Sequence, residues 1–413
     1  MQPSSTGIGR WQGIGLLVTT MLGTGVFVLP QLTLQQAGSL AMWSWGLLVI
    51  AMLPITRVFA ILGQHYPHAG GPAQFVERAF SPRQGRIIGL LFLLIVPMGA
   101  PAAIELTMEF VNLLVPITAA NRLMVELLLV GGILVLNWRG IRASGVWQTA
   151  LTLIILTIVI ALLIFHHPVT RELPMSRSTD HLGAMVSAFG LAMWSFIGIE
   201  TMTHLVNEFK NPDRDFQVSM MTGLLLVGLI YLGCTWLLLS VPGTADLTMS
   251  VVMDEVFGSG GRWIIGIIGT LSGLATVNVY VASISRLMWN LSQQGVLPVQ
   301  LSHLNRHKIP GNALIAQSVV IAVVLMMSGI LQFHYDVLIR CTNGVIVVIY
   351  LMSMISAWRL LSRHRLLVLT GGLVCLLFAW SLGIYMLYAL LFWGALQLFG
   401  LRIDRQAVRL KGS

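Results

Sequence analysis

The chain has 413 residues, of which 56% are hydrophobic and only 9% are charged, and its mean hydropathy is +0.85. Soluble domains carry about 25% charged residues, so this composition excludes a soluble globular protein and indicates a polytopic membrane protein. The net charge of +9 therefore has to be interpreted against membrane topology before any nucleic-acid partner is considered.

Membrane-spanning helices need about 20 mostly apolar residues each, and twelve stretches meet that length. In chain order they lie at roughly 11–36, 41–62, 87–115, 122–138, 146–165, 182–206, 217–241, 262–291, 312–331, 336–358, 365–380 and 383–400. The segment 365–400 is too long for one crossing of a core about 30 Å thick, so we expect a turn near Ser381 and Gly383. The sequence predicts an all-α polytopic membrane protein.

The basic residues are distributed unevenly between the two sides of such a topology. With a cytoplasmic N-terminus, only Arg122, Arg171, Arg177, Arg262 and Arg340 of the 24 Lys and Arg residues fall outside, which leaves 24 − 5 = 19 inside. This is the positive-inside bias. We expect both termini to lie in the cytoplasm and no nucleic-acid partner.

The first span is interrupted near its middle. Residues 21–30, MLGTGVFVLP, place Gly23, Thr24 and Gly25 half-way along it and close with a proline. Helix breaks survive at membrane depth only where they line a protein-enclosed cavity. Taken alone, a pair of glycines is also compatible with close helix packing.

A second interruption appears in the sixth span. Trp194, Ser195, Phe196 and Ile197 precede Gly198 at mid-span, and Glu200 follows. Two broken spans five helices apart indicate an inverted repeat with a substrate site between the halves. Freed N–H groups suit a carboxylate and freed carbonyls suit an ammonium, which together describe an amino acid. Choline-like or nucleobase substrates fit the same geometry.

Four motifs in order along the chain resemble one family. They are GTGVFVLP (23–30), PHAGGPAQFVERAF (67–80), WSFIGIETMTHLVNEFKNPDRDF (194–216) and SRLMWNLSQQGVLP (285–298). They are similar to motifs of the amino acid–polyamine–organocation (APC) superfamily of transporters. At closer range the chain resembles the bacterial neutral amino-acid efflux branch, the methionine and branched-chain amino acid exporters.

The resemblance implies a LeuT-like 5+5 inverted repeat with twelve transmembrane helices, of which helices 1 and 6 are discontinuous. We expect one transporter domain over 1–413, with repeats at about 11–165 and 182–358 and extra helices at about 365–400. The implied function is secondary active export of L-methionine, L-leucine, L-isoleucine and L-valine across the bacterial inner membrane, driven by a proton gradient or the membrane potential. The expected partners are the amino acid substrate, protons and membrane lipid.

The resemblance also assigns roles to residues. Gly23, Thr24 and Gly25 would bind the substrate carboxylate. The segment Trp194, Ser195, Phe196 and Ile197 would offer carbonyls to the amine and an aromatic lid. Tyr280 in the eighth span would contact the substrate side chain, and the expected wall of the cavity is soft and aromatic: Met21, Phe27, Met98, Met193, Trp194, Phe196 and Tyr280.

Charged side chains within spans are costly and mark functional sites by default. Glu200, after the second break, and Glu105, after the Pro97–Pro101 stretch expected to face the cavity, are predicted to serve coupling or gating. Glu109 and Glu126 lie nearer the span ends and are expected to reach the interface. The stretch 146–165 has no lysine, unlike relatives that use one in place of a sodium ion, so the coupling mechanism stays open.

Neither metal nor cofactor is expected, because Cys234, Cys341 and Cys375 lie in apolar spans and the histidines show no ligand spacing. No catalytic cluster recurs within helical reach, so an enzyme is not expected. The alternatives are a basic amino acid or polyamine antiporter, an uptake permease of the same superfamily, and, from a different class, a channel or a membrane-embedded enzyme.

Overall fold

The computed structural model describes residues 8–68, 70–140, 145–166, 180–239, 241 and 247–411, with the backbone alone described for 145–149 and 399–411. Arg171 and Arg177 therefore lie outside the described residues. Within this part the chain is all-helical, and its one β-bridge joins Ile8 to Phe209. The α-helices are α1 (Arg10–Leu22), α2 (Leu29–Ala37), α3 (Ala41–His65), α4 (Pro72–Ala79), α5 (Pro82–Leu93), α6 (Ile95–Leu114), α7 (Ala119–Trp138), α8 (Gly145–Phe165), α9 (His181–Ala192), α10 (Ile199–Met202), α11 (Gln217–Leu239), α12 (Thr248–Phe257), α13 (Gly261–Gln293), α14 (Gly311–Leu331), α15 (Tyr335–Leu360), α16 (Arg365–Leu382) and α17 (Met386–Lys411).

Nine helical runs among the described residues are long and apolar enough to cross a membrane, and Ala150–Phe165 forms a shorter apolar helix. The expected all-α, multi-pass architecture is confirmed, whereas the count of twelve is not. The number of long helical runs differs from the number of expected spans because some helices are broken and others are joined into one run. The first break leaves α1 with 13 residues, α2 continues into α3 as the run Leu29–His65, and α16 continues into α17 as Ser362–Leu398.

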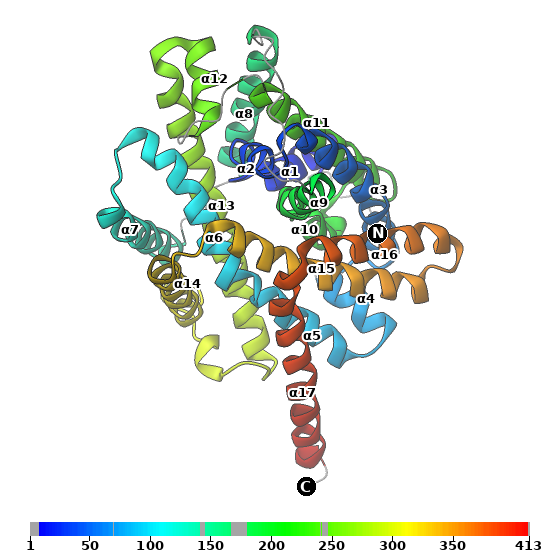
Figure 1. Cartoon of the computed structure of the whole chain (residues 1–413). Coiled ribbons are helices and arrows are strands. Elements are labelled where there is room, and N and C mark those ends of the chain that lie inside the picture. Colours follow the sequence, from blue (N-terminus) through cyan, green and yellow to red (C-terminus); the bar gives the residue numbers. More distant parts are fainter. Residues whose placement is uncertain are drawn as a thin grey trace.

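The last of these runs contains the expected turn. Helix α16 ends at Leu382, Gly383 has φ +53°, and α17 starts at Met386. A positive φ ends a helix at little cost only when the residue is glycine. Figure 1 shows α17 pointing away from the body of the molecule at a wide angle to α16. The segment 365–400 therefore forms two helices.

The first predicted break is present, and it lies at the glycines and just before the proline, as the sequence predicts. Helix α1 ends at Leu22, Gly23 has φ +30°, and α2 begins at Leu29 with Pro30 in its first turn. Proline is favoured there because the first N–H groups of a helix have no intrahelical partner. The residues between the two helices form turns, held by the N–H groups of Gly25 and Val26, which both donate to the Leu22 carbonyl at 3.2 Å.

The second predicted break is also present. Helix α9 gives way to a 3₁₀ turn, η2 (Met193–Phe196), then to extended backbone at Ile197, and Gly198 has φ +118°. Helix α10 restarts at Ile199. A Cβ on Gly198 would lie 2.6 Å from Cγ2 of Thr20 in α1. The two broken segments therefore touch each other directly.

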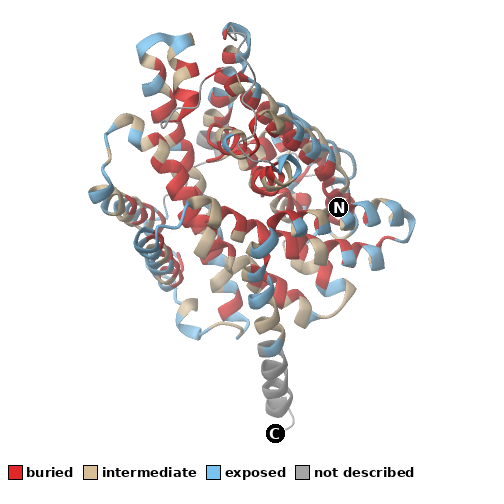
Figure 2. Cartoon of the chain, viewed as in Figure 1, coloured by how far each residue is buried: buried red, intermediate tan, exposed pale blue. Residues whose placement is uncertain are grey.

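Two groups of helices surround the broken segments (Figure 1). On one side α3 and α11 pack against α1, α2 and α9, and on the other α6 packs against α13 and α15. Buried residues concentrate at the centre, whereas α7 and α14 present exposed faces (Figure 2). Exposed apolar side chains such as Leu128 in α7 (65%) and Ile330 in α14 (79%) are expected where helices face lipid.

Glycines on one face of α13 allow its close approach to α6. A Cβ at Gly266 would lie 2.7 Å from Leu114, one at Gly269 2.2 Å from Phe110, and one at Gly273 2.2 Å from Thr107. Lipid supplies no hydrophobic drive for helices to associate, so small residues that let backbones pack closely stabilise the pair instead. This contact fixes two helices that line the central cavity described below.

We expect Gly269→Val to destabilise the protein by about 1–3 kcal/mol or more, because the added carbons meet the Phe110 ring. The measurement is thermal unfolding in detergent. Gly132→Val in α7, where nothing lies within 4 Å of the added Cβ, is the matched control and should unfold close to wild type. Equal melting temperatures for the two variants would contradict the role of this glycine face.

Candidate functional site

A cavity lies where the two broken segments meet. Its wall is formed by the end of α1, the first break, η2 and its following residue, α6, α13 and one residue of α15. The lining residues are Thr20, Met21, Gly23, Thr24, Gly25, Ile95, Val96, Gly99, Ala100, Ala103, Trp194, Ile197, Thr276, Val277, Tyr280, Val281 and Thr342. None of these side chains is charged.

Six of the eight predicted substrate-binding residues line this cavity: Gly23, Thr24, Gly25, Trp194, Ile197 and Tyr280. The other two, Ser195 and Phe196, are fully buried beside it. The structure therefore brings both interruptions and Tyr280 together around one space, although they are far apart in the sequence.

The breaks leave backbone groups without backbone partners. Among the described residues, no backbone carbonyl accepts from the N–H of Gly23 or Thr24, whereas the Gly25 N–H donates to Leu22. In the second break the Trp194 carbonyl accepts from the Ile197 N–H at 3.2 Å. Buried backbone groups are normally paired, so unpaired N–H groups on the wall of this cavity are available to an anionic ligand.

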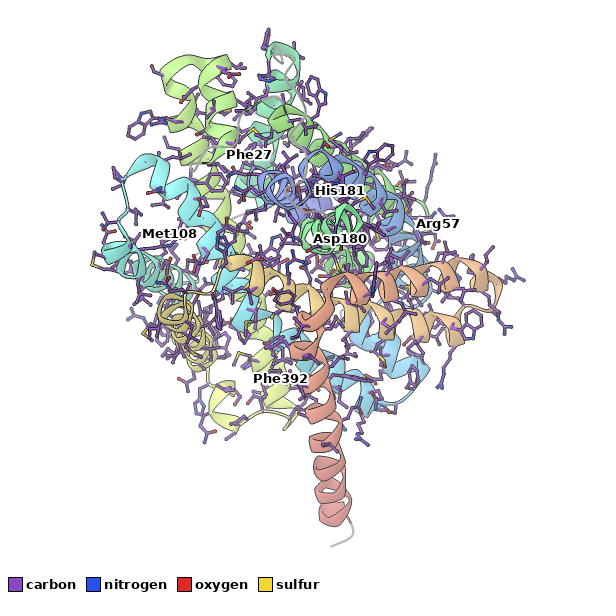
Figure 3. The ribbon with its side chains drawn as sticks, in the orientation of Figure 1. Phe27, Arg57, Met108, Asp180, His181 and Phe392 are labelled. Atoms are coloured by element: carbon purple, nitrogen blue, oxygen red, sulfur yellow. The ribbon has the colours of Figure 1, made fainter. Side chains whose placement is uncertain are left out.

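The cavity wall is more aliphatic than expected. Of the seven predicted wall residues, Met21, Trp194 and Tyr280 line it, and Phe27, Met98, Met193 and Phe196 do not. Phe27, labelled in Figure 3, is buried with its ring edge-on to Phe110 of α6, at a centroid distance of 6.4 Å. Ile95, Val96, Ala100, Ala103, Val277 and Val281 take their place. These residues face the cavity because of the α6–α13 packing, which has no local sequence motif.

A second cavity adjoins the first and shares Thr20, Gly23, Thr276 and Tyr280 with it. It extends between α1, α8 and α13, and Thr19, Thr152 and Ser272 add further hydroxyl groups to its wall. The Ser272 hydroxyl donates to the Gly23 carbonyl at 2.9 Å. The Ser272 hydroxyl on the wall of this side pocket thus stabilises the first break from the side of α13. No motif in the sequence predicts the pocket.

Glu200 lies next to the second break but does not line the cavity. It is 1% exposed, its carboxylate accepts from the Gly198 N–H at 3.1 Å, and the Tyr350 hydroxyl donates to it at 2.6 Å. The carboxylate thus satisfies one N–H group that the break releases, and it ties the break to α15. Its position is compatible with the predicted gating role.

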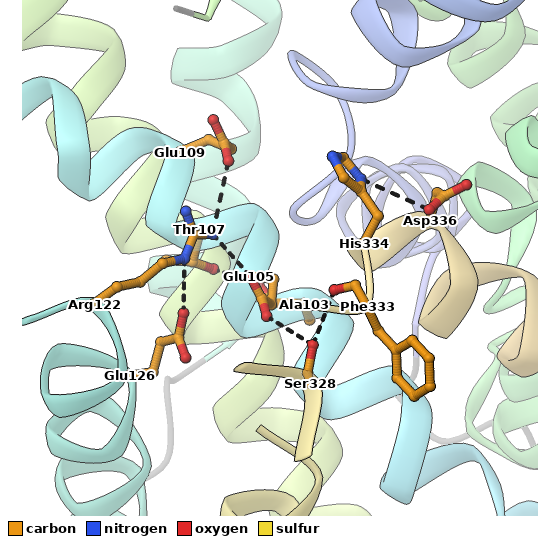
Figure 4. Close-up of polar contacts among 10 residues, drawn as sticks. All are labelled: Ala103, Glu105, Thr107, Glu109, Arg122, Glu126, Ser328, Phe333, His334 and Asp336. Atoms are coloured by element: carbon orange, nitrogen blue, oxygen red, sulfur yellow. Dashed lines mark hydrogen bonds and ion pairs between the residues drawn. The ribbon is translucent and has the colours of Figure 1, made fainter. Parts of the chain in front are cut away.

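Gly99 and Ala100 of the Pro97–Pro101 stretch line the cavity as expected, and Glu105 follows further along α6. It lies outside the cavity lining, and its carboxylate binds Arg122 of α7 at 2.8 Å (Figure 4). Glu126, expected at the interface, is 3% exposed and binds Arg122 Nε at 3.0 Å. Glu109 completes the group at 3.9 Å from Arg122. Arg122, which lies one helical turn before Glu126, thus pairs with carboxylates of both α6 and α7, and the coupling role of Glu105 stays a prediction.

Polar contacts also join the broken helices to their neighbours at two further places. Arg10 at the start of α1 forms a salt bridge with Asp215, two residues before α11, at 3.2 Å. Elsewhere, Arg340 of α15 donates to Gln36 Oε1 of α2 at 2.7 Å and to the Ser187 carbonyl of α9 at 3.2 Å. Both broken helices are thereby linked to the rest of the bundle away from the cavity.

The described part of the chain contains no group of three or more His, Cys, Asp or Glu side chains able to hold a metal ion. Comparison with known protein families gives a match along nearly the whole chain. The profile of the family described as amino acid permease matches residues 8–400.

Relatives agree with that match. The chain is 38% identical over 395 residues to the L-methionine/branched-chain amino acid exporter YjeH of Escherichia coli, covering 93% of both proteins. It is 23% identical to the uncharacterized amino acid permease YecA of Bacillus subtilis, over 86% of this chain and 85% of the relative. It is 21% identical to the cadaverine/lysine antiporter of E. coli, over 78% of this chain and 75% of the relative. With its broken helices around one uncharged cavity, the chain belongs to the amino acid permease family.

Proposed function

We propose that this protein is a secondary active transporter that exports neutral hydrophobic amino acids, L-methionine, L-leucine, L-isoleucine and L-valine, across the bacterial inner membrane. The observation that carries the proposal is the uncharged cavity between two broken helices, lined by free backbone groups at one end and aliphatic side chains elsewhere. The relative with 38% identity over 93% of both chains is an exporter of this substrate class.

The binding mode follows from the chemistry of the cavity wall. The N–H groups of Gly23 and Thr24 would receive the substrate carboxylate, with the field of the following α2 N-terminus behind them. Carbonyls from the segment 194–197 would accept from the ammonium. Trp194 and Tyr280, both on the cavity wall, would cover the substrate, and its side chain would lie against Val96, Ala103 and Val281.

The proposal includes the topology that the two breaks suggest. It is a LeuT-like 5+5 inverted repeat in one domain, with repeats at about 11–165 and 182–358, twelve membrane crossings and both termini in the cytoplasm. The equivalent position of the breaks in α1–α2 and in α9–α10, five expected spans apart, supports it. To test which side of the membrane residues 8 and 262 face, a single cysteine can be introduced at each position. Its accessibility to a membrane-impermeant reagent is then measured.

The direct test of function is counterflow in proteoliposomes loaded with unlabelled amino acid. Labelled methionine or leucine should accumulate transiently, and the signal should saturate with substrate concentration. A channel would instead give flux that does not saturate and no counterflow.

Gly25→Val should reduce transport at least tenfold while the protein still inserts and folds. A Cβ at this position lies 2.6 Å from Leu29 Cδ1 and 3.0 Å from the Tyr231 hydroxyl, so a β-branched side chain would displace the break. Gly15→Val, in α1 before the break and with nothing within 4 Å of the new Cβ, is the control and should transport normally. Normal transport by Gly25→Val would remove the argument for the first break.

Coupling is expected to involve protons or the membrane potential, with Glu200 as the leading carrier because it contacts the break itself. An uncoupler should abolish uphill export. Glu200→Gln should retain substrate binding and lose the response of transport to an imposed pH gradient, whereas Glu105→Gln should retain that response. The reverse result would transfer the role to Glu105, and export that ignores the uncoupler would refute proton or potential coupling altogether.

Specificity should follow from the absence of charge in the cavity wall. Placing the side-chain charge of arginine or glutamate there without a partner costs several kcal/mol, so both should bind at least a hundredfold more weakly than methionine. Leucine, isoleucine, valine and methionine should differ less, since one methylene changes binding by about 1–3 kcal/mol. Competition against labelled leucine measures this order, and tighter binding of arginine or lysine would favour a basic amino acid antiporter.

A further inference from the structure

A side chain of α15 holds the end of α9 directly before the second break. The amide N–H₂ of Asn343 donates to the Gly190 carbonyl at 2.9 Å and to the Leu191 carbonyl at 3.4 Å. Both residues belong to the last four of α9, whose carbonyls a terminating helix leaves without an α-helical donor. Because Asn343 is fully buried, its amide supplies a donor where solvent does not reach.

Only the donor half of this amide is used. Among the described residues, Oδ1 of Asn343 has no hydrogen-bond partner. The opposite orientation of the amide would place that oxygen against two carbonyl oxygens, so the acceptors at the end of α9 determine how the side chain lies. A buried oxygen without a partner costs free energy, which an apolar side chain of similar size would avoid. The contribution of Asn343 at this position is therefore its donation to α9.

The segment that Asn343 holds is also packed tightly against α16. A Cβ at Gly190 would lie 2.7 Å from Oγ of Ser381, so a glycine is needed for the two helices to approach this closely. Helix α15 itself packs against both α9 and η2. The last turn of α9 is thereby held by two helices, two residues before the 3₁₀ turn that lines the cavity.

The far side of the second break is held by the same helix. Tyr350 lies seven residues after Asn343, two turns further along α15, and so projects from the same face. Its hydroxyl donates to the Glu200 carboxylate at 2.6 Å, and that carboxylate accepts from the Gly198 N–H at 3.1 Å. Helix α15 thus contacts the backbone before the break directly and the backbone after it through one carboxylate.

We propose that Asn343 is a positioning residue that fixes the end of α9, so that the carbonyls of residues 194–197 are aligned with the substrate ammonium. The inference rests on the proposed function, because it assumes that these carbonyls bind the amine. Asn343 does not line the cavity and acts through the backbone of Gly190 and Leu191. Its loss should therefore weaken recognition of the amine and leave recognition of the substrate carboxylate and side chain unchanged.

The experiment measures Ki values for Asn343→Ala and wild type, by competition against labelled leucine on the purified protein. The ligands are leucine, leucinamide, which keeps the amine and lacks the carboxylate, and 4-methylpentanoate, which keeps the carboxylate and lacks the amine. We expect the Ki values of leucine and leucinamide to rise together, each about tenfold, the loss expected for one hydrogen bond. The Ki of 4-methylpentanoate should stay at the wild-type value, because this ligand has no amine to misplace.

The control is Ser353→Ala in the same helix. The Ser353 hydroxyl is buried and donates to the Ile349 carbonyl of α15 itself at 2.8 Å, so its removal should leave all three Ki values unchanged. Asn343→Leu, which has a side chain of similar volume and no donor, is a second variant should Asn343→Ala fold poorly. It should reproduce the pattern expected for Asn343→Ala.

A rise shared by all three ligands would indicate a general structural defect and would overturn the inference, as would an unchanged Ki for leucine or leucinamide. The proposed function fails through different results, which concern wild type alone. Wild type would then bind no leucine, or it would bind 4-methylpentanoate as tightly as leucine, which would mean that the amine is not recognised.

Discussion

Backbone groups released inside an apolar interior must find partners, and the rest of this structure depends on how that requirement is met at two breaks. In a membrane core an unpaired N–H or carbonyl costs several kcal/mol. The protein supplies some partners itself: Ser272 binds the Gly23 carbonyl, and the Glu200 carboxylate binds the Gly198 N–H. The N–H groups of Gly23 and Thr24 are left beside the cavity, where the substrate carboxylate of the proposed binding mode would complete the set.

The charged residues of the spans are kept away from that cavity. Glu200 is bonded to Tyr350, and Glu105 and Glu126 are bonded to Arg122. A charge facing the substrate would select for an opposite charge, so this separation is a condition for handling neutral side chains. It also places three carboxylates around one arginine between α6 and α7.

The parts of the site that depend on local sequence could be predicted, and those that depend on helix packing could not. Glycine and proline rules place the breaks at Gly23 and Gly198 without knowledge of the neighbours. Ala103 and Val281 have no such signal, because they line the cavity only once the glycine face of α13 lies against α6. The pairing of Arg122 with both Glu126 and Glu105 likewise depends on how α7 lies against α6, which no local motif indicates.

The two adjoining cavities explain why the first break can act as more than a passive binding surface. Gly23 lies on both walls, with its carbonyl held by Ser272 of α13. Thr276 and Tyr280 of the same helix also line both spaces. A shift of α1 against α13 would therefore change the Gly23 end of the first cavity and the hydroxyl-lined side pocket together. In the proposed binding mode, a group in the side pocket would be thermodynamically linked to substrate binding wherever the two favour different arrangements of these shared residues.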